Sequence, residues 1–191
     1  MRSSNSTHWF LVIGLIVLAA AARFAVPADW HNFSPIGAMA LFGAATIKRS
    51  WLAIALPIAA LFLSDLILNN TALSAWYDGG VTIFASYQAL TFGAMVLTVV
   101  LGRLIFARRI TALGVVGGSL GAAVLFFLVT NAGAWWMSPQ YTKDVSGLLA
   151  SYAAGVPFFH NTVVSQLLFG GVLFGLHAWM AHRVPSLRPA E

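Results

Sequence analysis

The stretch ITALGVVGGSLGAAVLFFLVTNAGAWWM (110–137) contains no charged residue over 28 positions. A helix needs about 20 mainly apolar residues to cross the hydrocarbon core of a bilayer, so this stretch predicts a transmembrane helix. The rest of the chain agrees with it. Hydrophobic residues make up 60% of the 191 residues and charged residues only 8%, whereas a soluble domain carries about 25% charged residues. The sequence therefore predicts an all-α integral membrane protein without a separate soluble domain.

Further apolar runs on both sides of this stretch predict one six-helix transmembrane bundle that forms a single domain over residues 1–191. The expected helices are Trp9–Val26, Ser34–Ile47 (which is short), Trp51–Leu68, Val81–Phe106, Ile110–Met137 and Thr162–Ala181. The first of them has a second interpretation. Arg2, the apolar run that follows it and the small residues Ala19–Ala22 also fit a cleavable secretory signal, and cleavage would leave five helices.

The basic residues indicate the orientation of the expected bundle. They fall before the first run, in alternate connections and after the last run: Arg2, Lys48, Arg49, Arg103, Arg108, Arg109, Arg183 and Arg188. Cytoplasmic connections carry an excess of Lys and Arg, so we expect this end, with both termini, to be cytoplasmic. The net charge of +5 follows from this topology. The lipid bilayer is thus an expected partner, and nucleic acid is not.

The third outer connection, residues 138–161, is the longest of the expected outer connections; the others are 27–33 and 69–80. Its apolar piece Val145–Phe159 carries Pro157 and is too short to span the membrane comfortably. We therefore expect a short interfacial or re-entrant helix that lies over the outer face as a lid. Several Trp and Tyr residues fall at this face, where they form either an aromatic belt or a stacking surface for a flat ligand.

Four polar residues, Asn32, Asp65, Asn131 and Asn161, lie near the outer ends of the apolar runs. Polar groups at hydrocarbon depth are costly and usually line a cavity or pair with one another, so we expect these four to surround one cavity. Asp65 is the single acid inside an apolar run. Either it anchors a ligand or a proton, or it is a structural partner of a group such as Asn131 or a helix N-terminus.

Motifs for catalysis or metal binding do not stand out. His31 and His160, at the outer face, lack the spacing of a motif such as HExxH, and the absence of cysteine excludes thiolate nucleophiles and ligands. We assign no catalytic residue and no metal ligand. Two other classes of function remain open: an intramembrane enzyme that uses Asp65 and His160 together with His31, and a membrane scaffold that transports nothing.

Small residues at GxxxG spacing occur in the last two runs, at Gly117 and Gly121 and at Gly171 and Gly175. This spacing lets helix backbones approach closely. We expect it to serve packing within the chain rather than dimerisation.

Five stretches of the chain resemble a family of small bacterial inner-membrane proteins of unknown function. They are HNFSPIGAMALFGA (31–44), ALPIAALFLSDLIL (55–68), FFLVTNAGAWW (126–136), GLLASYAAGVPFFHNT (147–162) and LLFGGVLFG (167–175). That family is similar to the substrate-binding S-components of energy-coupling-factor (ECF) vitamin transporters, including the solitary cobalamin transporter type. S-components capture a vitamin or metal ion in a pocket near the outer face, under their first, third and fifth loops.

The resemblance implies uptake of a vitamin-like small molecule, cobalamin or another vitamin, across the inner membrane, with no resident cofactor. Energy-coupling membrane and ATPase subunits are the implied partners. The expected ligand contacts are Asn32, Phe33, Asp65, Tyr87, Asn131, Trp135, Tyr141, His160 and Asn161. Two features depart from the pattern. Solitary cobalamin transporters present a cysteine thiolate to cobalt, which this chain lacks, and Ser165-Gln166 stands where the family usually has Gly-Asp.

Overall fold

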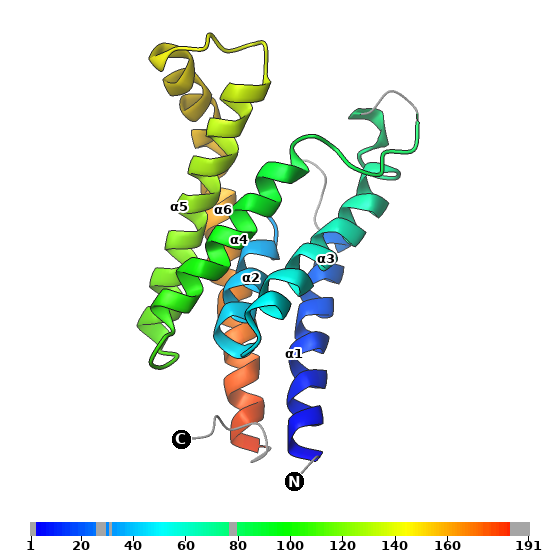
Figure 1. The fold of residues 1–191 in the computed structure, drawn as a ribbon, viewed down its shortest axis with the longest axis vertical. Helices are drawn as coiled ribbons and strands as arrows, with labels where there is room; N and C mark the ends of the chain where they lie inside the picture. Colours follow the sequence, from blue (N-terminus) through cyan, green and yellow to red (C-terminus); the bar gives the residue numbers. More distant parts are fainter. Residues whose placement is uncertain (1–2, 26–29, 31, 77–79, 184–191) are drawn as a thin grey trace.

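The computed structural model describes residues 3–25, 30, 32–76 and 80–183, and within these residues the regular structure is entirely helical (Figure 1). The helices are α1 (Ser3–Ala22), α2 (Ile36–Thr46), α3 (Ser50–Asn69), α4 (Gln88–Ile105), α5 (Ala112–Met137) and α6 (Val145–Arg183). Two single turns of 3-10 helix, Arg23–Ala25 and Ser74–Trp76, follow α1 and α3. The expected all-α class is thus confirmed for the described residues.

Four of the helices, α3 to α6, are long and apolar enough to cross a membrane. Their outward surfaces are apolar as well: Leu63, Leu104, Leu113 and Val172 are all exposed. A soluble monomer rarely exposes large contiguous apolar patches, whereas lipid-facing helices do so by necessity. These helices support the membrane assignment. The apolar part of α1 and all of α2 are shorter than a membrane-spanning helix, so six crossings remain a prediction.

The helix α2 is short because it is the centre of the bundle. Residues 36–44 are all buried, and each of the other five α-helices contacts α2. Its 11 residues span only about 16 Å. A helix that is hydrophobic all round belongs inside a protein, where it need not match the thickness of the bilayer. Arg103 of α4 donates to the carbonyl oxygen of Ile47 at 2.5 Å and so satisfies the C-terminal end of α2.

Glycines on the surrounding helices allow this close approach. A Cβ on Gly102 of α4 would lie 2.7 Å from Ala44 Cβ, and one on Gly118 of α5 would lie 3.1 Å from Leu41 Cδ2. A Cβ on Gly37 of α2 itself would lie 1.9 Å from Gln166 Nε2 of α6. The close packing of these helices therefore requires glycine, which has no Cβ, at these three positions.

Only one of the four glycines at GxxxG spacing makes the packing contact expected of it: a Cβ on Gly121 of α5 would lie 3.1 Å from Leu101 Cδ2 of α4. Gly117, Gly171 and Gly175 are exposed, and a Cβ on any of them would have no atom of another described helix within 4 Å. The contact positions are one residue away, at Gly118 and Gly170. One residue turns a helix by about 100°, so an offset of one position moves a glycine from the packed face toward the outside.

The helix α6 corrects the expectation of an interfacial or re-entrant helix over Val145–Phe159. It runs without interruption from Val145 to Arg183, and Pro157 lies inside it. Its 39 residues span about 58 Å, well beyond the hydrocarbon core of about 30 Å. The third outer connection is therefore residues 138–144, and the part expected to be a lid is the first half of a long helix.

Packing against α5 explains why Pro157 does not end α6. The Ser151 hydroxyl donates to the Asn131 carbonyl oxygen at 2.7 Å, and the Tyr152 hydroxyl donates to the Leu128 carbonyl oxygen at 3.1 Å. The rings of Phe127 and Phe159 lie 5.0 Å apart. A proline removes one hydrogen bond from a helix, and these contacts on both sides of it hold the helix together.

Polar groups of the short connection 138–144 form hydrogen bonds with the end of α5 and the start of α6. Lys143 Nζ donates to the carbonyl oxygens of Trp135 and Ser138, at 2.5 and 2.6 Å, and so satisfies the end of α5. Asp144 accepts from the Gly147 amide at 2.8 Å and so caps the start of α6. Trp135 Nε1 donates to the Thr142 carbonyl oxygen at 2.8 Å. These bonds make a tight α5–α6 hairpin.

The start of α4 also differs from the sequence prediction. The helix begins at Gln88 rather than Val81, and residues 80–87 form a loop. The first helix, in contrast, begins earlier than expected, at Ser3 rather than Trp9, and it ends at Ala22 rather than Val26. Its residues Val12, Ile16 and Ala19 are buried in the core, so α1 packs as a member of the bundle.

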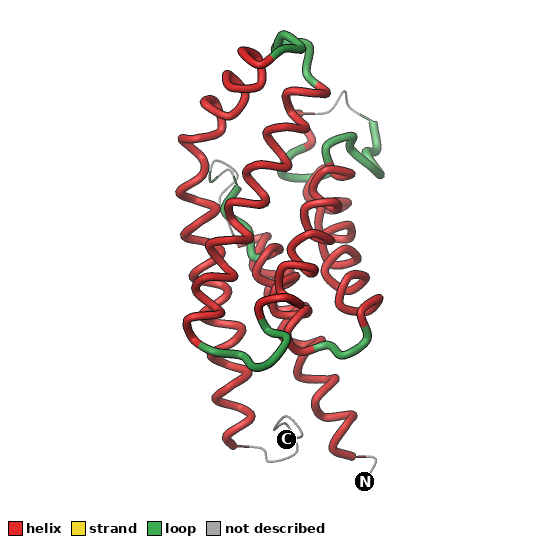
Figure 2. The backbone as a smooth tube through the Cα atoms, turned by 60° about the vertical axis from the view of Figure 1, so that its left-hand side comes forward, coloured by secondary structure: helices red, strands yellow, loops and turns green. Residues whose placement is uncertain are grey.

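The connections alternate between the two ends of the molecule. The start of α1, the end of α6 and the α2–α3 and α4–α5 connections lie toward one end, and the α5–α6 connection lies at the other (Figures 1 and 2). Lys48, Arg49, Arg108, Arg109 and Arg183 therefore share the first end. The other end is where the site described next is found.

Candidate functional site

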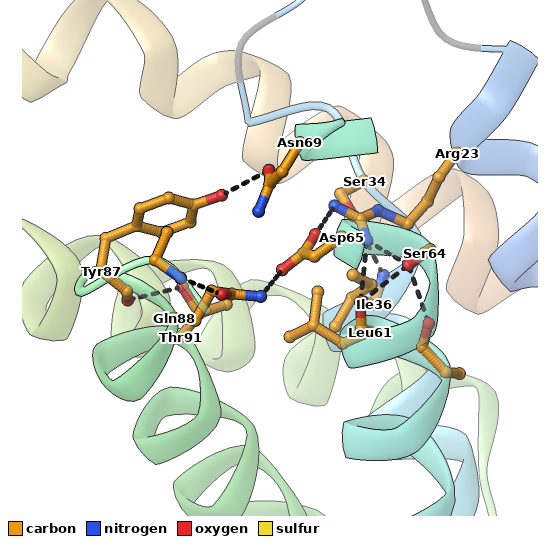
Figure 3. A network of polar contacts seen from close by, with 12 residues as sticks. Arg23, Ser34, Ile36, Leu61, Ser64, Asp65, Asn69, Tyr87, Gln88 and Thr91 are labelled. Carbon is orange, nitrogen blue, oxygen red and sulfur yellow. Dashed lines mark hydrogen bonds and ion pairs between the residues drawn. The ribbon is translucent and has the colours of Figure 1, made fainter. Parts of the chain in front are cut away.

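An ion pair links the end of α1 to the last turns of α3. Arg23 Nη2 lies 2.6 Å from Asp65 Oδ1, and the exposed fractions of the two side chains are 15% and 5% (Figure 3). Arg23 Nη1 also donates to the Ser64 hydroxyl and, at 3.5 Å, to the Leu61 carbonyl oxygen. The arginine thus covers the polar side of the last turns of α3.

Gln88, the first residue of α4, extends this network. Its Nε2 donates to Asp65 Oδ2 at 3.0 Å, and its Oε1 accepts from the Ala85 amide. The neighbouring Tyr87 donates its hydroxyl to Asn69 Oδ1 at 3.3 Å. Gln88 is fully buried, so the network ties α1, α3, α4 and the loop before α4 together inside the protein (Figure 3).

The network accounts for the cost of burying Asp65. Both carboxylate oxygens have a donor, and the negative charge has a guanidinium beside it. A buried ion pair is tolerated when its geometry is good and its remaining positions are hydrogen-bonded, whereas one partner alone is strongly destabilising. Asp65 therefore has structural partners, and these are Arg23 and Gln88 rather than Asn131 or a helix N-terminus.

A cavity of about 880 Å³ lies beside this network. Its walls come from α2 to α6, from Arg23 and Phe24 after α1, from the loop 80–87, and from residues 30, 32–34, 72, 73 and 138. The aromatic lining residues are Phe24, Trp30, Phe33, Phe84, Tyr87 and Phe126. The polar uncharged ones besides Tyr87 are Asn32, Ser34, Thr82, Ser86, Thr91, Thr130, Ser138, Thr162 and Gln166. Sites for small molecules typically enclose about 300–1,000 Å³ and combine apolar walls with a few polar groups, as this cavity does.

The loop 80–87 closes one side of the cavity and is fastened at both ends. Asn70 Nδ2 donates to the Thr82 carbonyl oxygen at 2.9 Å, and the Thr82 amide donates to Asn70 Oδ1 at 2.8 Å. Gln88 holds the other end through Ala85. Between these points Phe84 lines the cavity while remaining half exposed. A few side-chain hydrogen bonds, at Thr82, Ala85 and Tyr87, therefore hold this cover loop over the cavity.

Four of the nine residues expected to contact a ligand line the cavity: Asn32, Phe33, Asp65 and Tyr87. Asn32 is the only non-glycine residue with a positive φ, 64°, among the residues described. Asparagine tolerates this left-handed conformation better than most residues, and here it lets the chain turn at Asn32, just before Phe33. The chain thus presents Asn32 and Phe33 at the cavity wall.

The other five expected contacts lie elsewhere: Asn131, Trp135, Tyr141, His160 and Asn161. Asn131 donates to the Phe127 carbonyl oxygen and faces Gly155, so it belongs to the α5–α6 contact. Trp135 serves the α5–α6 hairpin, and Tyr141 is part of its connection. His160 is exposed on α6 and Asn161 is half-buried there. The expected convergence of four polar residues is therefore wrong for Asn131 and Asn161.

Sequence reasoning did not identify Arg23 and Gln88 as partners of Asp65, nor Gln166 as a cavity residue. A signal existed for the first of these. Arg23 is a basic residue at the outer end of an apolar run, and Asp65 is the one acid within such a run. Opposite charges at similar depth in a membrane commonly pair. Gln166 stood out only as a departure from the Gly-Asp that the resembled family usually has, and nothing in the sequence marks Gln88.

Across the described part of the chain, no group of three or more His, Asp or Glu side chains is placed to hold a metal ion. His31, named above with Asp65 and His160 for an enzyme, lies outside the described residues.

Residues 3–187 match the model of a family described as "Family of unknown function (DUF6580)". No curated protein and no solved structure matches the chain.

Proposed function

The chain belongs to the DUF6580 family of unknown function, and we propose that it is the substrate-binding subunit, or a solitary carrier, for uptake of a vitamin-like small molecule. The observation that carries the proposal is the cavity of about 880 Å³ within a bundle of membrane-type helices. Polar residues are costly inside a membrane, so membrane helices that enclose a cavity with polar walls usually do so for a function. The resemblance of this chain's sequence motifs to those of ECF S-components implies the same function.

The distribution of charge supports an outward-facing cavity. The basic residues of the α2–α3 and α4–α5 connections and the end of α6 lie at one end of the bundle, and the cavity-lining loops lie toward the other. By the positive-inside rule the first end is cytoplasmic, so the cavity opens to the outside of the inner membrane. Ligand would then enter from the periplasmic side.

The loop 80–87 is the part of the site best suited to move. Elements that close over ligands come from the less stable parts of a structure, and this loop is held by the Asn70–Thr82, Gln88–Ala85 and Tyr87–Asn69 hydrogen bonds. In the proposed cycle the ligand enters, the loop closes, and the bundle reorients or a partner releases the ligand inward. Any energy from ATP comes from partner subunits.

The two other classes of function have less support. An enzyme built on Asp65 and His160 requires the two side chains to act together, yet Asp65 lines the cavity with both oxygens occupied and His160 does not line it. A scaffold that binds no small molecule has no need of a cavity of this size. The geometry therefore favours a carrier.

A cavity-filling substitution tests this proposal. Ala134→Trp places an indole in the cavity from α5, and Ala153→Trp places one on the exposed surface of α6, away from the cavity. A thermal-shift screen of water-soluble vitamins, cobalamin included, should find compounds that raise the melting temperature of the wild type and of Ala153→Trp but not of Ala134→Trp, because only ligands of the folded state stabilise it. Compounds that stabilise all three proteins equally would place binding elsewhere.

A further inference from the structure

Among the described residues, the side-chain amide of Gln166 on α6 has a buried oxygen, Oε1, without a hydrogen-bond donor. Gln166 lines the cavity and is only 3% exposed. No donor among the described residues lies within hydrogen-bonding distance of its Oε1. A buried acceptor without a donor costs about 1–3 kcal/mol. Oε1 is itself covered, so a partner that enters the cavity bonds to it once the side-chain amide turns toward the cavity.

Two hydroxyls that line the cavity also leave acceptors rather than donors. Thr91 and Thr130 donate their hydroxyl protons to carbonyl oxygens of their own helices, at 3.3 and 2.8 Å. A hydroxyl that donates in this way still has lone pairs to accept with. Gln88 Nε2 and the two terminal nitrogens of Arg23, by contrast, donate to groups on α3.

The charge of the cavity is balanced within the protein. Arg23 and Asp65 are the only charged residues among its described lining residues, and they are bound to each other. A charged ligand entering this space would have no free countercharge, and an unpaired buried charge is costly. An uncharged ligand avoids this cost.

We infer that the ligand is an uncharged, flat molecule that donates an N–H or O–H hydrogen bond to Gln166 Oε1. This inference rests on the proposed function and specifies the class of its substrate. The aromatic side chains of Phe33, Phe84 and Phe126 supply apolar surfaces for a ring system. A cavity of about 880 Å³ holds a molecule of up to about 30 non-hydrogen atoms, if each takes the roughly 30 Å³ of a liquid water.

The test uses flat two-ring and three-ring heterocycles in four matched forms: neutral with a ring N–H, N-methylated, carboxylated and quaternised. Each is titrated against wild-type protein, Gln166→Met and the control Gln140→Met, whose glutamine is exposed in the α5–α6 connection. We expect the neutral N–H form to stabilise the wild type and the control. We expect its affinity to fall about tenfold or more on N-methylation, or on replacement of Gln166, because one hydrogen bond to a buried group is lost.

The same variants give a readout that needs no ligand. Methionine fills the space of the Gln166 side chain without a buried unbonded acceptor, so Gln166→Met should raise the melting temperature of the free protein by about 2–4 °C. A lower melting temperature would show that the amide is bonded within the protein and would overturn the inference. Stabilisation by the charged forms alone, or equal binding to Gln166→Met, would also overturn it while leaving the carrier proposal intact. If no form stabilised the wild type, the inferred ligand class would be wrong; the carrier proposal is contradicted separately, if no vitamin stabilises the wild type and Ala153→Trp.

Discussion

Arg23 and Asp65 are 42 residues apart in the sequence and only 2.6 Å apart in the structure. Through this contact the turn after α1 is fixed to α3 at the edge of the cavity. The same carboxylate binds Gln88, so the start of α4 is positioned by the same pair. The shape of the cavity therefore depends on a charge balance within the bundle.

Removing either charge alone should destabilise the protein more than removing both. Asp65→Leu or Arg23→Leu leaves an unpaired charge in a largely buried place, with an expected loss of about 3–5 kcal/mol, whereas the double substitution should regain much of this loss. Unfolding of the detergent-purified proteins measures the difference. If the effects of the two single substitutions simply add in the double variant, the pair is not coupled as the structure indicates.

The cover loop should loosen when its fastening is removed. Asn70→Ala deletes both hydrogen bonds to Thr82, so the amides of residues 81–85 should exchange with solvent about tenfold faster or more. Thr71→Ala is the matched control, because the Thr71 hydroxyl bonds only to the Ile67 carbonyl oxygen within its own helical turn. Equal exchange in both variants would mean that other contacts hold the loop.

Two glycines in membrane-type helices should respond in opposite directions to a methyl group. Gly102→Ala must displace Ala44 of the central helix and should cost about 1–3 kcal/mol. Gly171→Ala meets no described atom outside its own helix and should be neutral or stabilising by up to about 1 kcal/mol, because alanine favours a helix. Comparison of their melting temperatures checks the packing around α2, and a destabilised Gly171→Ala would reveal a helix contact that the chain alone does not make.

The capping of α6 should depend on pH. The Gly147 amide, followed by the Ser146 and Thr142 hydroxyls, lowers the pKa of Asp144 from 3.8 to about 2. Because the pKa is lower in the folded state, the carboxylate stabilises the helix start fully above about pH 4, and this stabilisation disappears as the pH falls toward 2. Exchange of the Gly147 amide, corrected for its intrinsic pH dependence, should speed up over this range.

Asp144→Asn provides the control for this titration. Asparagine keeps an oxygen that can cap the helix but does not ionise in this range, so the extra exchange at low pH should vanish. An unchanged pH profile would show that a different group titrates.

Helix positions followed from the sequence where an apolar run was long and ended in charged or turn residues. The helix α5 matches its expected run within two residues at its start, and α3 within one residue at each end. Hydropathy marks such helices because lipid contact requires a continuous apolar surface. The run beginning at Val81 was misassigned because a loop covering a cavity is as apolar as the start of a helix.

The extent of α6 and most of the site depend on contacts between distant residues. Pro157 is a valid helix-ending signal locally, and only the packing of Phe159 and Tyr152 on Phe127 shows why the helix continues. Asn131 looked like a cavity residue by depth alone, but depth does not specify which face of a helix a residue occupies. Depth did identify Asn32 and Asp65, which line the cavity, and Phe33 and Tyr87 were expected from the resemblance to a known family.

The account rests most directly on a cavity that is open to the outside and holds a small molecule, and cysteine labelling measures both properties together. The chain contains no cysteine, so Thr130→Cys places a single thiol in the cavity wall. Arg49→Cys places one in the α2–α3 connection at the basic end as a control. A membrane-impermeant maleimide added outside spheroplasts should label Thr130→Cys, and a compound that stabilises the protein should block that labelling, while Arg49→Cys should react only after permeabilisation. Labelling of Arg49→Cys but not Thr130→Cys from outside, or labelling of Thr130→Cys that a saturating compound leaves unchanged, would contradict the account.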